Sequence, residues 1–216
     1  MTLSLSVETS TATFAAALAA GGEVVAVRAL EGVPPARRDL PALVAGLLDG
    51  TGHTFADLGR VAVDVGPGNL TAVRTGVAYA NGLAFALGLG IATADSLELM
   101  AAQAGDGTPV LCLRNAGAGR AYAGLFAGGT ARYAHGPLRE VVAGTGPEVL
   151  VAGDFRAEVA DLLPGVVVKD TGIAGPDVRV LHRLTAARPT LDPTRERAAA
   201  PLTDTAPLFG GGGTDD

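Results

Sequence analysis

The opening third of the chain shows alternation of apolar and polar residues that is typical of strands. Residues 3–7 read Leu-Ser-Leu-Ser-Val, which has the period of two expected for a half-buried strand. Apolar runs follow at 13–20 and 23–30, separated by Gly21-Gly22, a pair that favours a hairpin. The chain is therefore predicted to begin with three antiparallel strands.

From Leu40 onward the apolar residues follow the spacing of a helix instead of that of a strand. Apolar residues recur at i, i+3, i+4, i+7 and i+8 through Leu48, which predicts one helix with a single apolar stripe. Pro41 lies in its first turn, where a missing N–H costs little. The rest of this half reads as a strand at 60–65, a helix ending near Gly88, a strand at 90–94 and a helix capped by Asp95 that runs to Ala104.

The composition shifts at Gly105-Asp106-Gly107, and we predict a boundary there. The predicted domains are 1–104, a smaller lobe at 105–187 and a Pro/Gly-rich tail at 188–216 that is mobile or lies over the surface. In the second lobe we predict strands at 109–114, 120–126, 150–152 and 166–169, and helices at 154–163 and 177–187. This pattern repeats the first half in shorter form, although no sequence repeat is visible. Both halves indicate an α/β fold with mixed sheets flanked by helices.

Small residues recur every four positions along the helix that ends near Gly88. Ala72, Gly76, Ala80, Ala84 and Gly88 form an unbroken strip, which would let another helix approach closely. The partner could be the chain's own helix at 40–48 or a helix of another chain. The predicted interface consists of Leu40, Leu43, Val44, Leu47, Ala72, Val73, Gly76, Ala80, Leu83 and Ala84.

Composition limits the possible partners. The 216-residue chain has a formal net charge of −6, whereas a protein that binds nucleic acid on its own usually presents a basic face. No run reaches the roughly 18 apolar residues that a membrane helix needs. The N-terminus lacks the pattern of a secretory signal, so we expect a cytoplasmic protein with no membrane association. The single cysteine, Cys112, lies in an apolar run and is predicted to be a buried strand residue.

A glycine-rich turn, Gly66-Pro67-Gly68, stands between a predicted strand and a predicted helix, where phosphate-binding loops are built. It has no lysine before the helix, and Pro67 removes one backbone N–H from any anion site. The turn either cradles a phosphate or sets the start of the helix with Asn69 as its N-cap. Glu8 and Asp64 follow predicted strands. Glu8 either caps the turn after it or forms part of a site, and Asp64 is either exposed or functional.

No catalytic or metal-binding pattern is present. His53, His135 and His182 are isolated, without the spacing of a zinc site. The G-x-S-x-G element of serine hydrolases is absent. We therefore expect no catalytic residues, no metal and no cofactor.

Several stretches together resemble one family. Residues 5–11, Leu-Ser-Val-Glu-Thr-Ser-Thr, resemble an (I/L)-A-I-D-T-S-T opening, and residues 66–76 resemble G-P-G-S-F-T-G-L-R-x-G. Asp95-Ser96-Leu97-Glu98 resembles S-S-L-E. These are marks of the bacterial TsaB (YeaZ) family, and the likeness covers about the first hundred residues. The motif residues are Glu8, Thr9, Ser10, Gly66, Pro67, Gly68, Thr71 and Arg74.

The resemblance implies a reduced actin-like (Hsp70/sugar-kinase) fold with two small lobes. It implies a non-catalytic scaffold subunit for the transferase TsaD, joined by the ATPase TsaE, in making threonylcarbamoyladenosine next to the tRNA anticodon. The two helices at 40–48 and 70–88 would contact TsaD, or a second copy when the protein is alone, and tRNA would be met only through the complex. Substituting Gly76→Leu or Ala80→Trp should then abolish TsaD binding and leave the chain folded.

The sequence departs from the family at several positions. Glu8 replaces Asp, Asn69 replaces Ser, Leu70 replaces Phe and Ala72 replaces Gly, and Asn115-Ala116-Gly117 stands in place of D-A-R. Two other functions remain open besides the scaffold role. One is an independent actin-like ATPase or small-molecule kinase, and the other is a peptidase. The first requires phosphate loops in both lobes, and the second requires a nucleophile or metal set that the sequence lacks.

Overall fold

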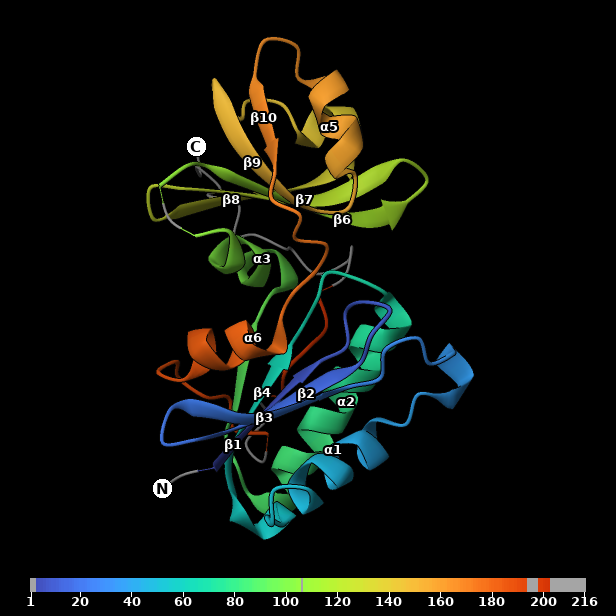
Figure 1. The fold of residues 1–216 in the computed structure, drawn as a ribbon, viewed down its shortest axis with the longest axis vertical. Coiled ribbons are helices and arrows are strands. Elements are labelled where there is room, and N and C mark those ends of the chain that lie inside the picture. Colours follow the sequence, from blue (N-terminus) through green and yellow to red (C-terminus); the bar gives the residue numbers. More distant parts are fainter. Residues whose placement is uncertain (1–2, 106, 194–197, 203–216) are drawn as a thin grey trace, which may run out of the picture.

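A computed structural model of the chain describes residues 3–105, 107–193 and 198–202 (Figure 1). Two lobes stand one above the other, each built on a five-stranded mixed sheet. The first lobe carries the N-terminus, and the chain crosses between the lobes more than once.

The first sheet has the strand order β3-β2-β1-β4-β5. β1, β2 and β3 are antiparallel, and β4 and β5 continue parallel to β1. The predicted hairpin at Gly21-Gly22 is confirmed. The elements are β1 (Leu3–Glu8), β2 (Ala15–Ala20), β3 (Glu23–Ala29), the short helix η1 (Pro35–Arg37), α1 (Leu40–Asp49), the short helix η2 (Phe55–Asp57), β4 (Leu58–Asp64), α2 (Leu70–Leu87) and β5 (Ile91–Ala94).

The second sheet, read as β8-β7-β6-β9-β10, repeats the same order and the same directions. The structure thus confirms a duplicated unit without sequence repetition. Sequence reasoning missed its third strand, β8, in which Gly136 and Pro137 weaken the strand pattern. The elements are β6 (Val110–Gly117), β7 (Arg120–Ala127), β8 (Thr130–Pro137), α4 (Leu138–Val141), β9 (Glu148–Gly153), α5 (Arg156–Leu162) and β10 (Val167–Asp170).

Two further helices are exchanged between the lobes. α3 (Ser96–Ala104) follows the first sheet but packs on the second, against β6, β7 and β9. α6 (Val178–Thr185) follows the second sheet but packs on the first, against β1, β2, β4 and β5 (Figure 1). The packing therefore crosses the predicted boundaries after residues 104 and 187, which stay predictions. Residues 188–193 and 198–202 also contact the first lobe, through Leu191 and Ala199.

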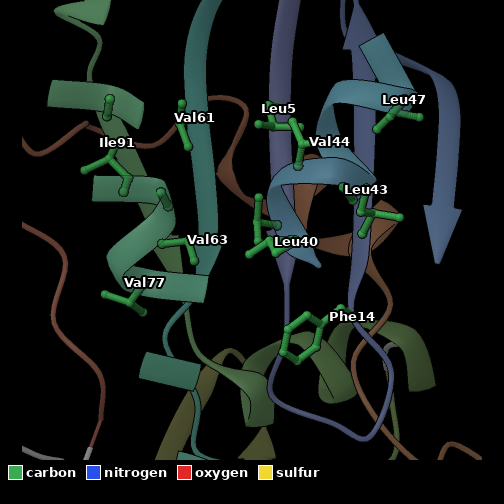
Figure 2. Close-up of a cluster of buried hydrophobic side chains, with 14 of the residues drawn as sticks. Leu5, Phe14, Leu40, Leu43, Val44, Leu47, Val61, Val63, Val77 and Ile91 are labelled. Carbon is green, nitrogen blue, oxygen red and sulfur yellow. The ribbon is translucent and has the colours of Figure 1, made fainter. Parts of the chain in front are cut away.

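The two faces of the first sheet differ in chemistry because side chains alternate along each strand. Leu3, Leu5 and Val7 of β1 belong to a large aliphatic core shared with α1 and α2. Figure 2 shows Leu5 beside Val44 of α1 in this core. The opposite face presents Ser4, Ser6 and Glu8. There the Ser4 hydroxyl lies 3.3 Å from Nδ1 of His182 on α6.

The predicted helix starts are confirmed. Asn69 caps α2 by accepting from the Ala72 N–H at 3.2 Å, and Asp95 caps α3 by accepting from the Glu98 N–H at 2.8 Å. The Glu98 carboxylate does not complete a capping box and instead pairs with Arg188. Gly88, with φ of 66°, ends α2 in the left-handed conformation that glycine tolerates best.

Candidate functional site

Glu8 ends β1 with its side chain fully enclosed. Its Oε1 accepts from both the N–H and the hydroxyl of Ser10, each at 2.6 Å, so the carboxyl group caps the turn that follows it. Burial, the largest cause, and the nearby Asp64 raise the pKa of Glu8 to about 8. Glu8 therefore caps the turn, as one of the two readings of the sequence had it. Its carboxyl group is largely protonated at neutral pH.

Asp64 ends the neighbouring strand β4 and is also buried, which corrects the expectation of an exposed side chain. It accepts from the Gly66 N–H at 2.8 Å and from the Ser96 hydroxyl at 2.9 and 2.7 Å. Burial raises the pKa of Asp64 to about 7, against the lowering effect of these hydrogen bonds. Asp64 thus ties the glycine turn to the first turn of α3.

Arg114 of β6 joins the two lobes. Its guanidinium donates to the Ser10 carbonyl at 3.1 Å and lies 3.7 Å from Asp154. It borders a cleft of about 660 Å³ between the lobes, whose walls include Glu8, Thr11, Thr13, Gln103, Asp154 and Asp177. The sequence had marked neither Arg114 nor this contact, because the partners lie 104 positions apart.

The glycine turn is packed tightly against the turn after β1. The Asn69 N–H donates to the Ser10 carbonyl at 2.9 Å, and a Cβ on Gly68 would lie 2.3 Å from the same oxygen. The Gly66-Pro67 peptide bond is cis. Gly68 is therefore required for close contact between two backbone segments, and this supports the reading of the turn as the start of α2.

A phosphate at these turns would displace existing bonds. The Ser10 N–H is already bonded to Glu8, the Gly66 N–H to Asp64 and the Asn69 N–H to the Ser10 carbonyl. The two buried carboxyl groups would also oppose an added negative charge once ionised. The geometry thus favours a structural junction over an anion site.

Ala72, Gly76, Ala80 and Ala84 of the small-residue strip face inward, whereas Gly88 at the end of α2 is exposed. Gly76 packs on the turn after β1, because a Cβ there would lie 2.2 Å from Thr9 Oγ1, and the Thr9 hydroxyl donates to the Ala72 carbonyl at 2.8 Å. Ala80 and Ala84 are fully buried in the core of the first lobe. Among the residues proposed for the interface, Leu40, Leu43, Val44, Leu47, Ala72, Val73, Gly76, Ala80 and Ala84 are buried by the chain itself, and Leu83 packs partly against the same core.

The outward side of α2 is a different surface, which we call the outer face. It consists of Leu70, Thr71, Arg74, Thr75, Ala78, Gly82, Phe85 and Ala86, all exposed. Leu70 is 41% exposed and Phe85 is 64% exposed. Arg74 is the sole charged residue of α2, so the outer face is weakly charged and partly apolar.

The remaining candidates are structural. Asp95, whose pKa burial raises to about 6, accepts from the Tyr133 hydroxyl at 3.0 Å and so links α3 to β8. Cys112 is buried as predicted, and burial raises the pKa of its thiol well above the usual range. Within the described residues, no group of three or more His, Cys, Asp or Glu side chains could hold a metal ion, and no helix could span a membrane.

Two sheets of one topology, exchanged helices and a cleft between the lobes define a reduced actin-like fold. The fold matches that of YeaZ from Pseudomonas aeruginosa with a TM-score of 0.76, at 24% identity, over 94% of this chain and 100% of that one. A second structure, an uncharacterized protein with similarity to peptidase YEAZ from the same organism, matches equally well over 99% of its length.

Sequence comparison agrees with the fold. Residues 36–141 match the family model "TsaD: tRNA N6-adenosine threonylcarbamoyltransferase". The tRNA threonylcarbamoyladenosine biosynthesis protein TsaB of Bacillus subtilis is 37% identical over 109 residues. That match covers 49% of this chain and 44% of the relative, so the chain spans less than half of the curated relative that it matches. Together these findings support membership of the TsaB/YeaZ family.

Proposed function

We propose that the chain is a non-catalytic scaffold subunit that binds and supports a TsaD-like transferase in the formation of threonylcarbamoyladenosine in tRNA. The name of the Bacillus subtilis relative and the match at residues 36–141 support the pathway. The strand-end carboxyl groups support a structural role, since each is bonded to the turn that follows its strand. A TsaE-like ATPase would join the complex, in the cytoplasm, and tRNA would be bound only through the complex.

The outer face of α2 is the observation that carries the proposal. An exposed phenylalanine and leucine on one weakly charged helix face are typical of a surface that another protein covers. The proposed interface therefore keeps α2, one of the two helices predicted from the sequence, but moves to its opposite side. Alone, the chain would pair with a second copy through this face.

The test is co-purification with a TsaD-like transferase, using Phe85→Asp in α2. A carboxylate at the centre of an apolar contact should weaken binding by at least about tenfold. Val167→Asp on β10 is the matched control, because Val167 is 54% exposed in the other lobe. Both variants should keep the wild-type Tm.

Two outcomes contradict the proposal in different ways. If Phe85→Asp binds as tightly as wild type, the interface lies elsewhere. If the wild-type chain binds no transferase, and deleting its gene leaves threonylcarbamoyladenosine in bulk tRNA unchanged, the scaffold function is wrong.

The alternative is an independent actin-like ATPase or small-molecule kinase, and the cleft of about 660 Å³ between the lobes is the observation that favours it. Calorimetric titration of the chain with Mg-ATP separates the two functions. The scaffold role predicts no micromolar binding, because the amide groups at the turns are already bonded.

A further inference from the structure

After α6, which already packs on the first lobe, the chain reaches the free edge of the first sheet at β5. The Leu191 N–H donates to the Ile91 carbonyl at 2.8 Å, and the Ile91 N–H donates to the Leu191 carbonyl at 2.9 Å. Before this, the Arg188 side chain donates to the Thr93 carbonyl at 3.0 Å. The edge of β5 is thus covered by the chain's own C-terminal part.

Residues 198–202, which we call the strap, continue onto α2. The Asn81 side chain donates to the Ala199 carbonyl at 2.8 Å and accepts from the Ala199 N–H at 3.0 Å. The Leu202 N–H donates to the Val65 carbonyl at 2.8 Å. Ala199 is buried, whereas Ala198 and Ala200 are exposed, an alternation that is typical of extended backbone.

An amide side chain that bonds both the N–H and the C=O of one residue holds an extended segment whatever its side chains are. The strap is therefore held through its backbone, as a peptide ligand would be, by α2 and by the residue after β4. Ala199 and Leu202 add apolar contact with the core of the first lobe.

The strap borders the outer face of α2. Asn81 lies one helical turn from both Ala78 and Phe85, since residues three or four apart are neighbours on a helix surface. α1 packs on β2 and β3, whereas the strap bonds Val65, the residue after β4, which lies nearer the other end of the strand order. α2 is therefore held between α1 on one side and the strap on the other.

We propose that the strap is a positioning element, which holds α2 in the orientation that presents Phe85 and the outer face to the partner. The proposal rests on the proposed function, because it concerns how the partner surface is kept in place. Releasing the strap should loosen α2 and weaken partner binding while the chain stays folded. The strap itself need not contact the partner.

The experiment uses the full chain with Asn81→Ala, which removes both bonds to Ala199. Because the substitution removes two hydrogen bonds, we expect amide exchange in the C-terminal half of α2 to rise roughly thirtyfold. The dissociation constant for the TsaD-like transferase should rise by about the same factor. Far-ultraviolet circular dichroism should be unchanged.

Two controls separate the strap from general effects. Asn115→Ala is the matched substitution in the second lobe, where Asn115 Oδ1 accepts from the Gly117 N–H, and it should alter neither readout. A chain that stops at Leu202 keeps the strap and should behave as wild type, whereas one that stops at Pro193 lacks it and should resemble Asn81→Ala.

Amide exchange and transferase affinity together show which part of the inference is wrong. Unchanged exchange in Asn81→Ala and in the chain that stops at Pro193 shows that the strap does not hold α2 and overturns the inference. Faster exchange with unchanged affinity overturns its link to the partner surface. A wild-type chain that binds no transferase refutes the proposed function and that link together, while the exchange data still decide whether the strap holds α2.

Discussion

The two lobes share one strand order but differ in the helices that connect their strands. In the first lobe the connections are α1, with 10 residues, and α2, with 18. The equivalent connections of the second lobe are α4, with four residues, and α5, with seven. The long helices bury a large aliphatic core and still leave an outer face free. The two lobes therefore differ in their connecting helices and in the surfaces these helices present, although they share one sheet topology.

The lobes differ in the same way at their strand ends. β1 and β4 of the first lobe end in Glu8 and Asp64, both buried and both with raised pKa values. The matching ends of β6 and β9 carry Gly117 and Gly153, and Asp154, which follows β9, is partly exposed. The buried acids belong to the lobe whose turns hold the start of α2. This suggests that they serve the placement of that helix.

The largest expected effect comes from comparing two glycines of α2. Gly76→Leu places a side chain into Thr9 and should destabilise the fold by about 3 kcal/mol, the upper end of the usual cost of overpacking. This corrects the expectation that Gly76→Leu, like Ala80→Trp at a fully buried position, would spare the fold. Denaturant unfolding measures the change.

Gly82→Leu is the control on the same helix. A Cβ on Gly82 meets nothing within 4 Å, so leucine should be neutral or stabilising by up to about 1 kcal/mol through helix propensity. Equal destabilisation by both substitutions would show that α2 does not pack through the strip.

The next largest effect is a pH dependence of folding stability that arises from two buried acids of the first lobe. Glu8 and Asp64 have folded-state pKa values of about 8 and 7, above the ordinary values of 4.5 and 3.8. The folded state therefore binds more protons than the unfolded state between about pH 4 and pH 8, and stability falls as pH rises through that window. We expect a loss of at least about 2 kcal/mol from pH 5 to pH 8.

Glu8→Gln should flatten this pH profile, because glutamine keeps an acceptor for Ser10 but does not titrate. In the second lobe, Asp154→Asn removes a partly exposed acid and should change the profile little. Chemical denaturation at several pH values makes the comparison. A wild-type profile that rises from pH 5 to pH 8 would contradict the assignment of raised pKa values.

The smallest effect is expected at the sheet edges. Val25 is the extra residue of a β-bulge, where the register of β2 and β3 shifts, and Val167 lies on β10 at the edge of the second sheet. Their side chains are 51% and 54% exposed. Val25→Thr and Val167→Thr should each change the unfolding free energy by less than about 0.5 kcal/mol, measured by thermal unfolding. A large loss of unfolding free energy at either site would contradict this expectation.

The sequence predicted most elements because their patterns are local. The stripe from Leu40 to Leu48 and the alternation in residues 3–7 each need only a few neighbours to be read. β8 was missed because it is held by β7 along its whole length, which no local pattern reports. The small-residue strip was found by spacing, but spacing does not tell whether a strip faces a sheet or another chain.

The site was harder to predict because its contacts join residues that are far apart in the sequence. The burial of Asp64 depends on Ser96, 32 residues away, and the placement of Ser10 depends on Arg114, 104 residues away. The only signals available were the acids at strand ends and the likeness at residues 66–76. These marked the turns correctly but could not show that the turns bond to each other.

The exchange of α3 and α6 has a consequence for synthesis on the ribosome. One face of the first sheet is covered by α6, whose last residue is Thr185, so this face stays uncovered until synthesis has passed that residue. That face carries Ser4, Ser6 and Glu8, whereas the aliphatic face is covered much earlier by α1 and α2. Until α6 has been made, the nascent chain thus exposes the more polar face of the first sheet, which reduces the apolar surface available for aggregation.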